Sequence, residues 1–385
     1  MENDSALKVL LVAEGSGGHL IPALQVAKAL AKSGARTKVW YAQRQQMAPL
    51  ADALVQETSD GLVDVDAIAT DGSRSLLGRL WQCGQLWHRA QRCFDTFSPD
   101  VVVGFGGWIC APIVLAARRQ RIGCVLHEQN VVMGKANRWL APWVDQIALS
   151  FPQTRSSARA ARSLITGMPV RQTIGQLSRH RAAQQFGFDP SRPTLLVLGG
   201  SQGSRALNQL MLETLPSWSA EERQRWQVIH LTGPADEHRV AAAYAQAGVT
   251  ARVASYVVEM GAAYAHADLV VARAGASTIA ELAKCGTPAL LIPYPYAGGH
   301  QRANARLVET VGGGLMLEER AAHPDRLMGA FRRLLADARL RAIMGAQMQT
   351  LNFDDAAERL TQAIAEVANG RTRDHHPRSG GRFHD

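Results

Sequence analysis

Short apolar runs alternate along the chain with longer stretches in which apolar residues recur at helical spacing. The apolar runs of the first half predict strands over residues 8–12, 37–41, 101–104, 124–127 and 164–167. Those of the second half predict strands over residues 195–198, 228–231, 252–254, 269–271 and 289–292. Because most of the runs are continuous, we expect strands buried on both faces, as in parallel sheets with helices between successive strands.

The start of the first half is repeated at the start of the second. Residues 195–203 (LLVLGGSQG) align without gaps on residues 10–18 (LLVAEGSGG), a spacing of 185 residues from Gly15 to Gly200. Each copy combines a strand, a loop rich in glycine and serine, and a helix, as mononucleotide-binding units do. The sequence therefore predicts an α/β protein with two doubly wound, Rossmann-like domains facing a cleft in which ligands bind.

The predicted domains cover residues 1–168 and 169–352, and the chain crosses between them at Met168-Pro169-Val170-Arg171. Two aspartates near residue 354 cap a last helix, predicted over residues 353–368. The remaining residues, 369–385, are rich in Gly, Arg and His and predict a disordered basic tail.

The most informative stretch of the second half runs from residue 268 to residue 304. A helix predicted from Thr278 to Cys285 follows a buried strand and a turn of small residues, an arrangement that suits anionic or hydroxyl-rich ligands. Glu281 lies three residues after Thr278, so it either forms a capping box with Thr278 or binds the hydroxyls of a ribose. The polar run Gly298-Gly299-His300-Gln301 follows an aromatic loop and could hold a sugar.

Two further positions in the first half carry candidate chemistry. His19, at the junction of the first loop and its helix, is either a general base or a packing histidine. The second strand ends in Tyr41-Ala42-Gln43-Arg44 without the acid that a nicotinamide site would require. Asp64 and Asp66 resemble a metal-binding pair, but the alternation of residues 62–69 places both on a solvent face, so we interpret them as structural and predict no metal site.

The charge distribution restricts the class of partner. The net charge is +9, and no Asp or Glu occurs over residues 72–94 or 146–188. Such surfaces suit phosphates or anionic lipids. No zinc-finger spacing, RNA-binding signature or basic heptad region accompanies them, so we expect no nucleic-acid partner.

The cysteines and the apolar runs indicate the compartment. The cysteines are odd in number and form no Cys-x-x-Cys pair, which predicts reduced core residues in a cytoplasmic protein. No apolar run approaches the roughly 18 residues of a membrane-spanning helix, so we expect a chain that does not cross a bilayer. The cysteines are Cys83, Cys93, Cys110, Cys124 and Cys285.

Residues 73–92 form an amphipathic pattern with a basic surround. Its large apolar face either lies in a membrane interface or packs in the core, and the pattern alone leaves both open. The residues of this face that we single out are Leu76, Leu77, Leu80, Trp81 and Trp87.

Taken together, four motifs resemble those of the MurG family of bacterial N-acetylglucosaminyltransferases. They are Gly15-Ser16-Gly17-Gly18-His19, His127-Glu128-Gln129-Asn130, residues 199–205 (GGSQGSR) and residues 273–278 (RAGAST), together with Glu281 and Gln301. The likeness extends from about residue 8 to residue 365. It implies the GT-B architecture, with the last helix returning to the first domain. Glu14 and Met168 depart from the family pattern, which has a glycine and an asparagine there.

The resemblance also implies roles for individual residues. His19 would be the base, and Glu281 would bind the ribose. The donor-binding residues that it implies are Ser16, Gly17, Gly18, Asn130, Arg171, Ser201, Val257, Ala276, Ser277, Thr278, Ile279, Ala280, Glu281 and Gln301. No cofactor and no metal are implied.

The activity that the resemblance implies is transfer of N-acetylglucosamine from UDP-GlcNAc to lipid I, forming lipid II for peptidoglycan. The enzyme would bind peripherally to the anionic cytoplasmic face of the inner membrane, near proteins of cell-wall synthesis, cell division and cell shape. Three alternatives stay open: transfer to another lipid acceptor, a UDP-GlcNAc 2-epimerase, and a nucleotide-sugar binding protein without activity.

Overall fold

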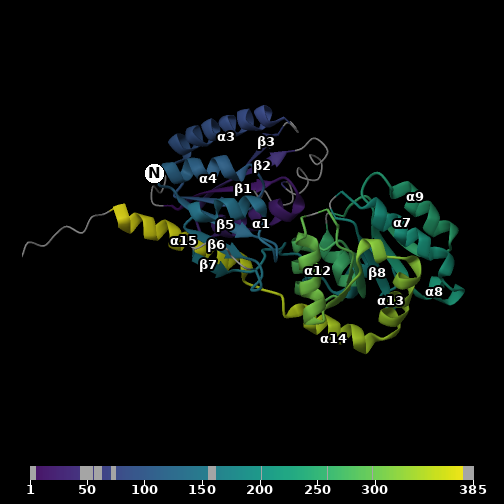
Figure 1. Cartoon of the computed structure of the whole chain (residues 1–385). Helices are drawn as coiled ribbons and strands as arrows, with labels where there is room; N and C mark the ends of the chain where they lie inside the picture. Colours follow the sequence, from purple (N-terminus) through teal and green to yellow (C-terminus); the bar gives the residue numbers. More distant parts are fainter. Residues whose placement is uncertain are drawn as a thin grey trace, which may run out of the picture.

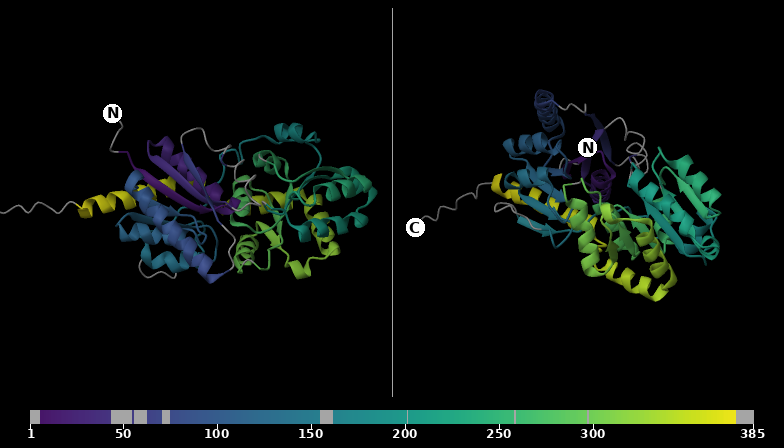
Figure 2. Two further views of the ribbon diagram at one scale, coloured as in Figure 1. Left: turned by 90° about the horizontal axis from the view of Figure 1, so that it is seen from above. Right: turned by 45° about the vertical axis from the view of Figure 1, so that its right-hand side comes forward.

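The computed structural model of the chain describes residues 6–43, 55, 63–70, 75–154, 162–200, 202–257, 259–296 and 298–375. Two parallel sheets, each covered by helices, form two lobes that lie next to each other (Figure 1). The yellow helix at the C-terminal end runs back along the first lobe, which is drawn in purple and blue. Figure 2 shows the same division into lobes from two further directions.

The sheet of the first lobe has the strand order β3-β2-β1-β4-β5-β6-β7, and all neighbouring strands are parallel. Because the order reverses between β1 and β4, the loops that follow these two strands meet at the carboxyl edge of the sheet. The strands are β1 (Lys8–Glu14), β2 (Arg36–Gln43), β3 (Asp64–Ala69), β4 (Val101–Gly104), β5 (Gly123–Glu128), β6 (Gln146–Leu149) and β7 (Arg162–Ile165).

Helices cover both faces of the first sheet. One core contains side chains of α1 and α15, such as Leu24, Leu360 and Ile364, so the C-terminal helix packs on the first lobe. The other core contains side chains of α3 and α4, such as Leu86 and Ile113. The helices are α1 (Gly17–Lys32), α3 (Leu76–Phe97), α4 (Cys110–Arg119), α5 (Lys135–Leu140) and α15 (Ala356–His375).

The second sheet repeats this topology in the order β10-β9-β8-β11-β12-β13, with its reversal between β8 and β11. Its strands are β8 (Thr194–Leu198), β9 (Gln227–Leu231), β10 (Thr250–Ala254), β11 (Leu269–Ala272), β12 (Ala289–Leu291) and β13 (Gly314–Met316). The helices are α6 (Arg179–Phe186), α7 (Arg205–Thr214), α8 (Ala220–Arg225), α9 (Glu237–Gln246), α10 (Met260–His266), α11 (Ala276–Cys285), α12 (His300–Val311), α13 (Pro324–Ala336) and α14 (Ala338–Gln349). Short 3-10 turns occupy Ala141–Trp143, Leu215–Ser217 and Glu319–Ala321.

The structure confirms the predicted α/β class and differs from the sequence prediction at several boundaries. Strands β6 (QIAL) and β13 (GLM) were not predicted, because they begin with glutamine and glycine and leave apolar runs of only three and two residues. Helix α11 begins at Ala276, two residues earlier than predicted. Helix α15 extends to His375, so residues 369–375 of the predicted tail are helical, and residues 376–385 lie outside the described residues.

Each lobe buries a histidine that makes its stability depend on pH. Burial lowers the pKa of His127 to about 4 and that of His230 to about 3, from an ordinary value of 6.5. The unfolded chain therefore binds more protons below pH 6.5, so the stability is fully present above that pH and falls as the pH decreases. Between pH 6.5 and 5 we expect a loss of about 1 to 2 kcal/mol for each imidazole, measured by urea unfolding.

The variant His230→Gln provides the control for this pH dependence. It removes one buried imidazole, so its unfolding free energy should change less steeply over the same pH range. Carboxylates titrate mainly below this range, so they contribute little to the slope. An unfolding free energy that stays constant from pH 6.5 to 5 would contradict the prediction.

Candidate active site

A cavity of about 780 Å³ lies between the two lobes, where the carboxyl edges of both sheets meet. It is large enough to enclose a nucleotide sugar. The first lobe contributes the start of α1 and the loop after β5, and the second lobe contributes loops after β8, β11 and β12. The lining residues include Gly18, His19, Gln129, Asn130, Gly199, Gly200, Gln202, Gly203, Ser204, Arg205, Arg273, Gly275, Ala276, Ser277, Thr278, Tyr294, His300, Gln301 and Glu319.

Glycine is required in both nucleotide-type loops because the backbone passes close to other strands. A Cβ atom at Gly15 would collide with the carbonyl oxygen of Ala42. Gly203 has a φ of +73°, and a Cβ atom there would collide with the carbonyl oxygen of Thr232. In the alignment of the two halves Gly15 matches Gly200 and Gly203 matches Gly18, and a Cβ atom at either partner would meet no atom within 4 Å. The close approach that requires glycine therefore falls at a different position of the loop in each lobe.

Three helices present N-termini without a side-chain cap near the cavity. The N-cap residues of α1, α11 and α12 are Ser16, Gly275 and Gly299, and no side chain of these residues caps its helix. The first backbone N–H groups of a helix have no partner within the helix, and they carry the positive end of its dipole. The cavity is therefore suited to an anionic ligand such as a diphosphate.

His19 lies at the wall of this cavity, in the first turn of α1. Its Nδ1 atom is 2.7 Å from Ser16 Oγ, and its ring packs beside Gly106 of the loop after β4. Burial, with a smaller contribution from His300, lowers the pKa of His19 to about 4. The imidazole is therefore neutral at pH 7 and can accept a proton.

Glu281 lies in the second turn of α11 and faces the interior of the second lobe. Tyr264 donates its hydroxyl to Glu281 Oε2 at 2.8 Å, and Arg171 Nη2 lies 3.6 Å from Glu281 Oε1. Burial and the nearby carboxylate raise the pKa of Tyr264 well above its ordinary value, so the hydroxyl remains a donor. The predicted capping box between Thr278 and Glu281 is therefore wrong, because α11 begins at Ala276 and its N-cap is Gly275.

Asn130 and Gln301 line the cavity from opposite lobes. The side chain of Asn130 donates to Glu128 Oε1 at 3.2 Å, and Gln301 Oε1 accepts the backbone N–H of Tyr294 at 2.9 Å. Both side chains are therefore held in fixed orientations, as residues that bind a sugar must be.

The structure brings together part of the predicted donor site. Ser277 and Thr278 line the cavity, whereas Ile279, Ala280 and Val257 are packed in or against the second lobe and do not line it. Arg171 and Glu281, which contact each other, do not line the cavity either. Of the remaining predicted positions, Ser16 contacts His19, Gly17 is buried, Gly18 and Ala276 line the cavity, and Ser201 lies outside the described residues.

Arg273 is a cavity residue to which the sequence analysis assigned no role. Its guanidinium donates to Ser204 Oγ at 2.8 Å and to the carbonyl oxygen of Ile292 at 3.0 Å. It also pairs with Glu319 and stacks over Tyr294 at 5.6 Å. The signal that could have identified it is an arginine directly after the buried strand β11, where ligands of parallel sheets bind.

The two positions that depart from the family pattern are both buried. Glu14 is 9% exposed and packs against Gly107, which follows β4. Met168 is 5% exposed, and its sulfur accepts a hydrogen bond from Ser150 Oγ at 3.6 Å. Neither residue lines the cavity between the lobes.

The amphipathic stretch divides into an exposed part and a core part on α3. Leu77, Leu80 and Trp81 are 80%, 60% and 62% exposed. Trp87 is half-buried and packs against the core of the first lobe, so the structure places it with the core. The side chain of Leu76 lies outside the described residues. Within the described ranges, every helix is too short or too polar to cross a membrane.

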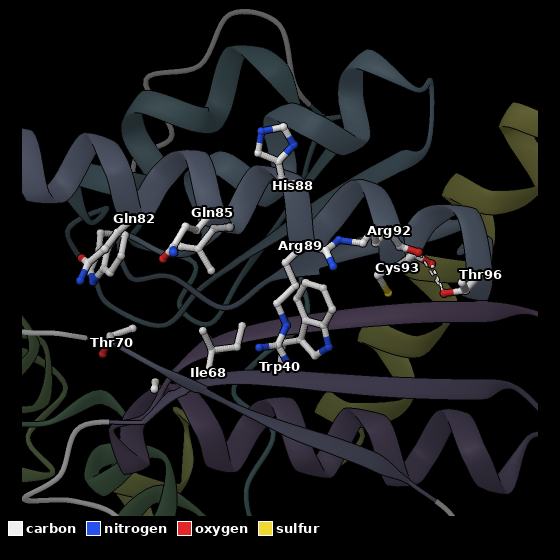
Figure 3. A pocket seen from close by; sticks show the side chains of 13 residues that line it. Trp40, Ile68, Thr70, Gln82, Gln85, His88, Arg89, Arg92, Cys93 and Thr96 are labelled. Atoms are coloured by element: carbon white, nitrogen blue, oxygen red, sulfur yellow. Dashed lines mark hydrogen bonds between the residues drawn. The ribbon is translucent and has the colours of Figure 1, made fainter.

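A second cavity of about 780 Å³ lies between α3 and strands β2 and β3 (Figure 3). Arg89 extends from α3 toward Trp40, and its guanidinium stacks on the indole at 5.1 Å. Trp40 Nε1 donates to Asp66 Oδ2 at 3.0 Å, and Lys38 pairs with Asp64 at 2.8 Å. These contacts support a structural role for both aspartates, and the described residues contain no cluster of three potential metal ligands.

Two Rossmann-like lobes around a cavity lined by helix N-termini define a protein of the GT-B glycosyltransferase class. Sequence profiles agree: the glycosyltransferase family 28 N-terminal domain matches residues 9–149, and its C-terminal domain matches residues 194–360. The chain belongs to glycosyltransferase family 28 and, within it, to the MurG family.

Curated relatives and solved structures support this assignment over nearly the whole chain. The UDP-N-acetylglucosamine–N-acetylmuramyl-(pentapeptide) pyrophosphoryl-undecaprenol N-acetylglucosamine transferase of Nitrosococcus oceani is 38% identical, covering 95% of this chain and 100% of its own. The protein of the same name from Syntrophotalea carbinolica is 36% identical and covers 94% and 99%. Acinetobacter baumannii MurG has a TM-score of 0.73 at 25% identity, covering 94% and 99%. The UDP-GlcNAc 2-epimerase of Neisseria meningitidis, at 13% identity and a TM-score of 0.69, covers 94% and 100% and shares the fold.

Proposed function

We propose that the protein transfers N-acetylglucosamine from UDP-GlcNAc to the 4-hydroxyl of lipid I, the undecaprenyl-pyrophosphoryl-N-acetylmuramyl-pentapeptide, and so forms lipid II. The observation that carries the proposal is the cavity between the lobes. It places a neutral imidazole of the first lobe opposite the nucleotide-type loops of the second. The names and full-length similarity of the relatives support the same reaction.

In this proposal the second lobe binds the donor. The N-terminus of α11, with Ser277 and Thr278, receives the diphosphate, because its first N–H groups lack a side-chain cap. Glu281 binds the ribose hydroxyls and Val257 contacts the uracil. Because Glu281 is only 5% exposed and contacts Tyr264 and Arg171, donor binding must move the side chains that cover its carboxylate.

The chemical step is a single displacement at the anomeric carbon. His19 takes the proton of the acceptor 4-hydroxyl as that oxygen attacks the carbon and the bond to the UDP oxygen breaks. The electron pair of the broken bond leaves with UDP, whose negative charge is stabilised by the helix N-termini at the cavity. Arg171 does not line the cavity, so in this proposal it adds positive charge from behind, beside Glu281. Because attack occurs opposite the leaving group, the α-linked donor gives a β-linked product.

The exposed residues Leu77, Leu80 and Trp81 bring the enzyme to its lipid acceptor in this proposal. Their surroundings are basic, so apolar insertion and attraction to anionic lipids act together. The proposed location is the cytoplasmic face of the inner membrane, with cell-wall synthesis and division proteins as neighbours.

Replacing Leu77 and Trp81 with glutamine is expected to release the protein from vesicles that contain anionic lipid. Each substitution removes an apolar side chain that would enter the membrane interface. The expected loss of membrane-binding free energy is roughly 1.5 to 3 kcal/mol per residue. Vesicle co-sedimentation measures the loss, and donor affinity should not change because α3 does not line the donor cavity. The variant Ile343→Gln, an exposed apolar residue of the second lobe, serves as the control. Equal sedimentation of all variants would refute this docking.

Transfer of labelled N-acetylglucosamine to lipid I, with a chelator present, tests the proposed function. We expect labelled lipid II and no turnover of the donor when lipid I is omitted. Conversion of the donor without acceptor would instead indicate an isomerase on the shared fold. Transfer to diacylglycerol but not to lipid I would indicate a different lipid acceptor.

A further inference from the structure

A chain of buried hydrogen bonds crosses between the lobes beside the cavity. Its central residue is Asn304 on α12, which is fully buried. The side-chain amide of Asn304 donates to Ala274 O and to Asn130 Oδ1, each at 3.1 Å. Its carbonyl oxygen accepts the backbone N–H of Val131 at 3.0 Å. One asparagine of the second lobe therefore contacts the loop after β11 in its own lobe and the loop after β5 in the other.

The other hydrogen bonds of Asn130 come from groups of the first lobe. Glu128, which is 1% exposed, accepts the backbone N–H and the side-chain amide of Asn130 at 2.9 and 3.2 Å. Thr154 donates its hydroxyl to the carbonyl oxygen of Asn130 at 3.0 Å. These bonds fix the backbone and one end of the Asn130 amide. The contact from Asn304 to the oxygen of that amide comes from the opposite lobe.

A second contact between the lobes lies one helical turn away on the same helix. His300 Nδ1 is 3.0 Å from the carbonyl oxygen of Val132. Residues four apart lie on the same face of a helix, so His300 and Asn304 together contact the backbone of residues 131–132. Figure 1 shows α12 at the side of the second lobe that borders the first.

We propose that Asn304 is a positioning residue that couples closure of the lobes to the orientation of Asn130 in the cavity. Opening the lobes breaks its bonds to Asn130 and Val131 but leaves its bond to Ala274, because that bond lies within the second lobe. The Asn130 amide then loses the donor that fixes its oxygen. Closed lobes and an oriented Asn130 therefore form together, which aligns the two substrates for transfer. This role of Asn304 rests on the proposed function only in the test that measures sugar transfer.

A double-mutant cycle separates this role from a direct one. Asn304→Ala and Asn130→Ala are each expected to lower kcat by roughly tenfold, the effect of one or two lost hydrogen bonds. If Asn304 acts through Asn130, adding Asn304→Ala to the Asn130→Ala variant should cause little further loss. Multiplied losses in the double variant would overturn the proposal.

Distances between the lobes provide a readout that does not depend on catalysis. Spin labels are attached at Arg119→Cys and Glu221→Cys, two exposed positions on different lobes, and the distance between them reports closure when UDP-GlcNAc is added. Cys83 and Cys285, which are partly exposed, are replaced by serine so that they are not labelled. We expect a closed population in the wild-type background and a reduced one with Asn304→Ala. An unchanged population with Asn304→Ala would overturn the proposal. If the protein transfers no sugar at all, the proposed function is wrong, but the label distances still show whether Asn304 favours the closed arrangement of the lobes.

Asn208→Ala is the matched control for loss of a buried asparagine. Asn208 is also fully buried, and its amide donates to Thr232 O and Asp236 Oδ2 at 3.0 and 2.9 Å, within the second lobe. We expect a loss of thermal stability comparable to that of Asn304→Ala, without a change in the label distances. If Asn208→Ala changed the label distances as much as Asn304→Ala does, the change would be a general effect of lost stability. That result would overturn the specific role of Asn304.

Discussion

His19→Ala is expected to lower kcat for transfer by about 10²- to 10⁴-fold, the contribution of a positioned general base. The affinity for UDP-GlcNAc should change much less than kcat, because most of the donor contacts are assigned to the second lobe. Transfer kinetics and calorimetric titration with the donor measure the two effects. His238→Ala, an exposed histidine on α9, is the control and should retain full activity. A kcat for His19→Ala within a few-fold of wild type would remove His19 as the base.

The pH dependence of kcat gives a second measurement on the same residue. Burial and His300 lower the pKa of His19 to about 4, so the imidazole remains neutral and able to accept a proton as the pH falls through 6.5. We therefore expect the acidic decline of kcat well below pH 6.5. A decline with a midpoint at or above 6.5 would contradict a base in this environment.

Glu281→Ala is expected to impair both donor binding and stability. Removing the carboxylate breaks the buried ion pair with Arg171, and removal of one member of such a pair costs about 3–5 kcal/mol. Loss of a charged hydrogen-bond partner for the ribose costs about 1.5–3 kcal/mol more in binding, or roughly 10- to 150-fold in Kd. Thermal unfolding and calorimetry measure the two losses.

Two further variants separate folding from binding at this position. Replacing the pair by Arg171→Met and Glu281→Leu should recover most of the stability, because apolar side chains then replace both members of the buried ion pair, but should not recover donor affinity. Glu281→Gln retains an acceptor for the Tyr264 hydroxyl and should be the mildest single change. Wild-type donor affinity in the double variant would show that Glu281 has only a structural role.

Most of the fold could be predicted because its signals are local. Continuous apolar runs identified the buried strands, and the repeated glycine loops identified two copies of one unit. Strands β6 and β13 escaped prediction because they begin with glutamine and glycine, so that their apolar runs are only three and two residues long. The start of α11 was placed two residues late because its N-cap is Gly275, and the small residues after it gave no clear helical signal.

The surroundings of the site residues could not be predicted, since they depend on contacts between distant parts of the chain. The spacing of Glu281 and Thr278 favoured a local cap, whereas the carboxylate pairs with Tyr264 and Arg171, 17 and 110 positions earlier. Asn304 carried no local signal at all, because its role follows from contacts with a loop of the other lobe. Helical spacing likewise could not separate Trp81, which is exposed, from Trp87, which packs on the core.

The central claim is that the two lobes hold a sugar diphosphate and an acceptor hydroxyl on opposite sides of one cavity, so that the sugar moves in a single displacement. Nuclear magnetic resonance of a reaction containing the enzyme, UDP-GlcNAc and lipid I follows the anomeric proton and the released UDP together. We predict a β-linked N-acetylglucosamine on the 4-oxygen of the acceptor, with one UDP released for each product formed. An α-linked product, or an isomerised donor with the acceptor unchanged, would contradict the account.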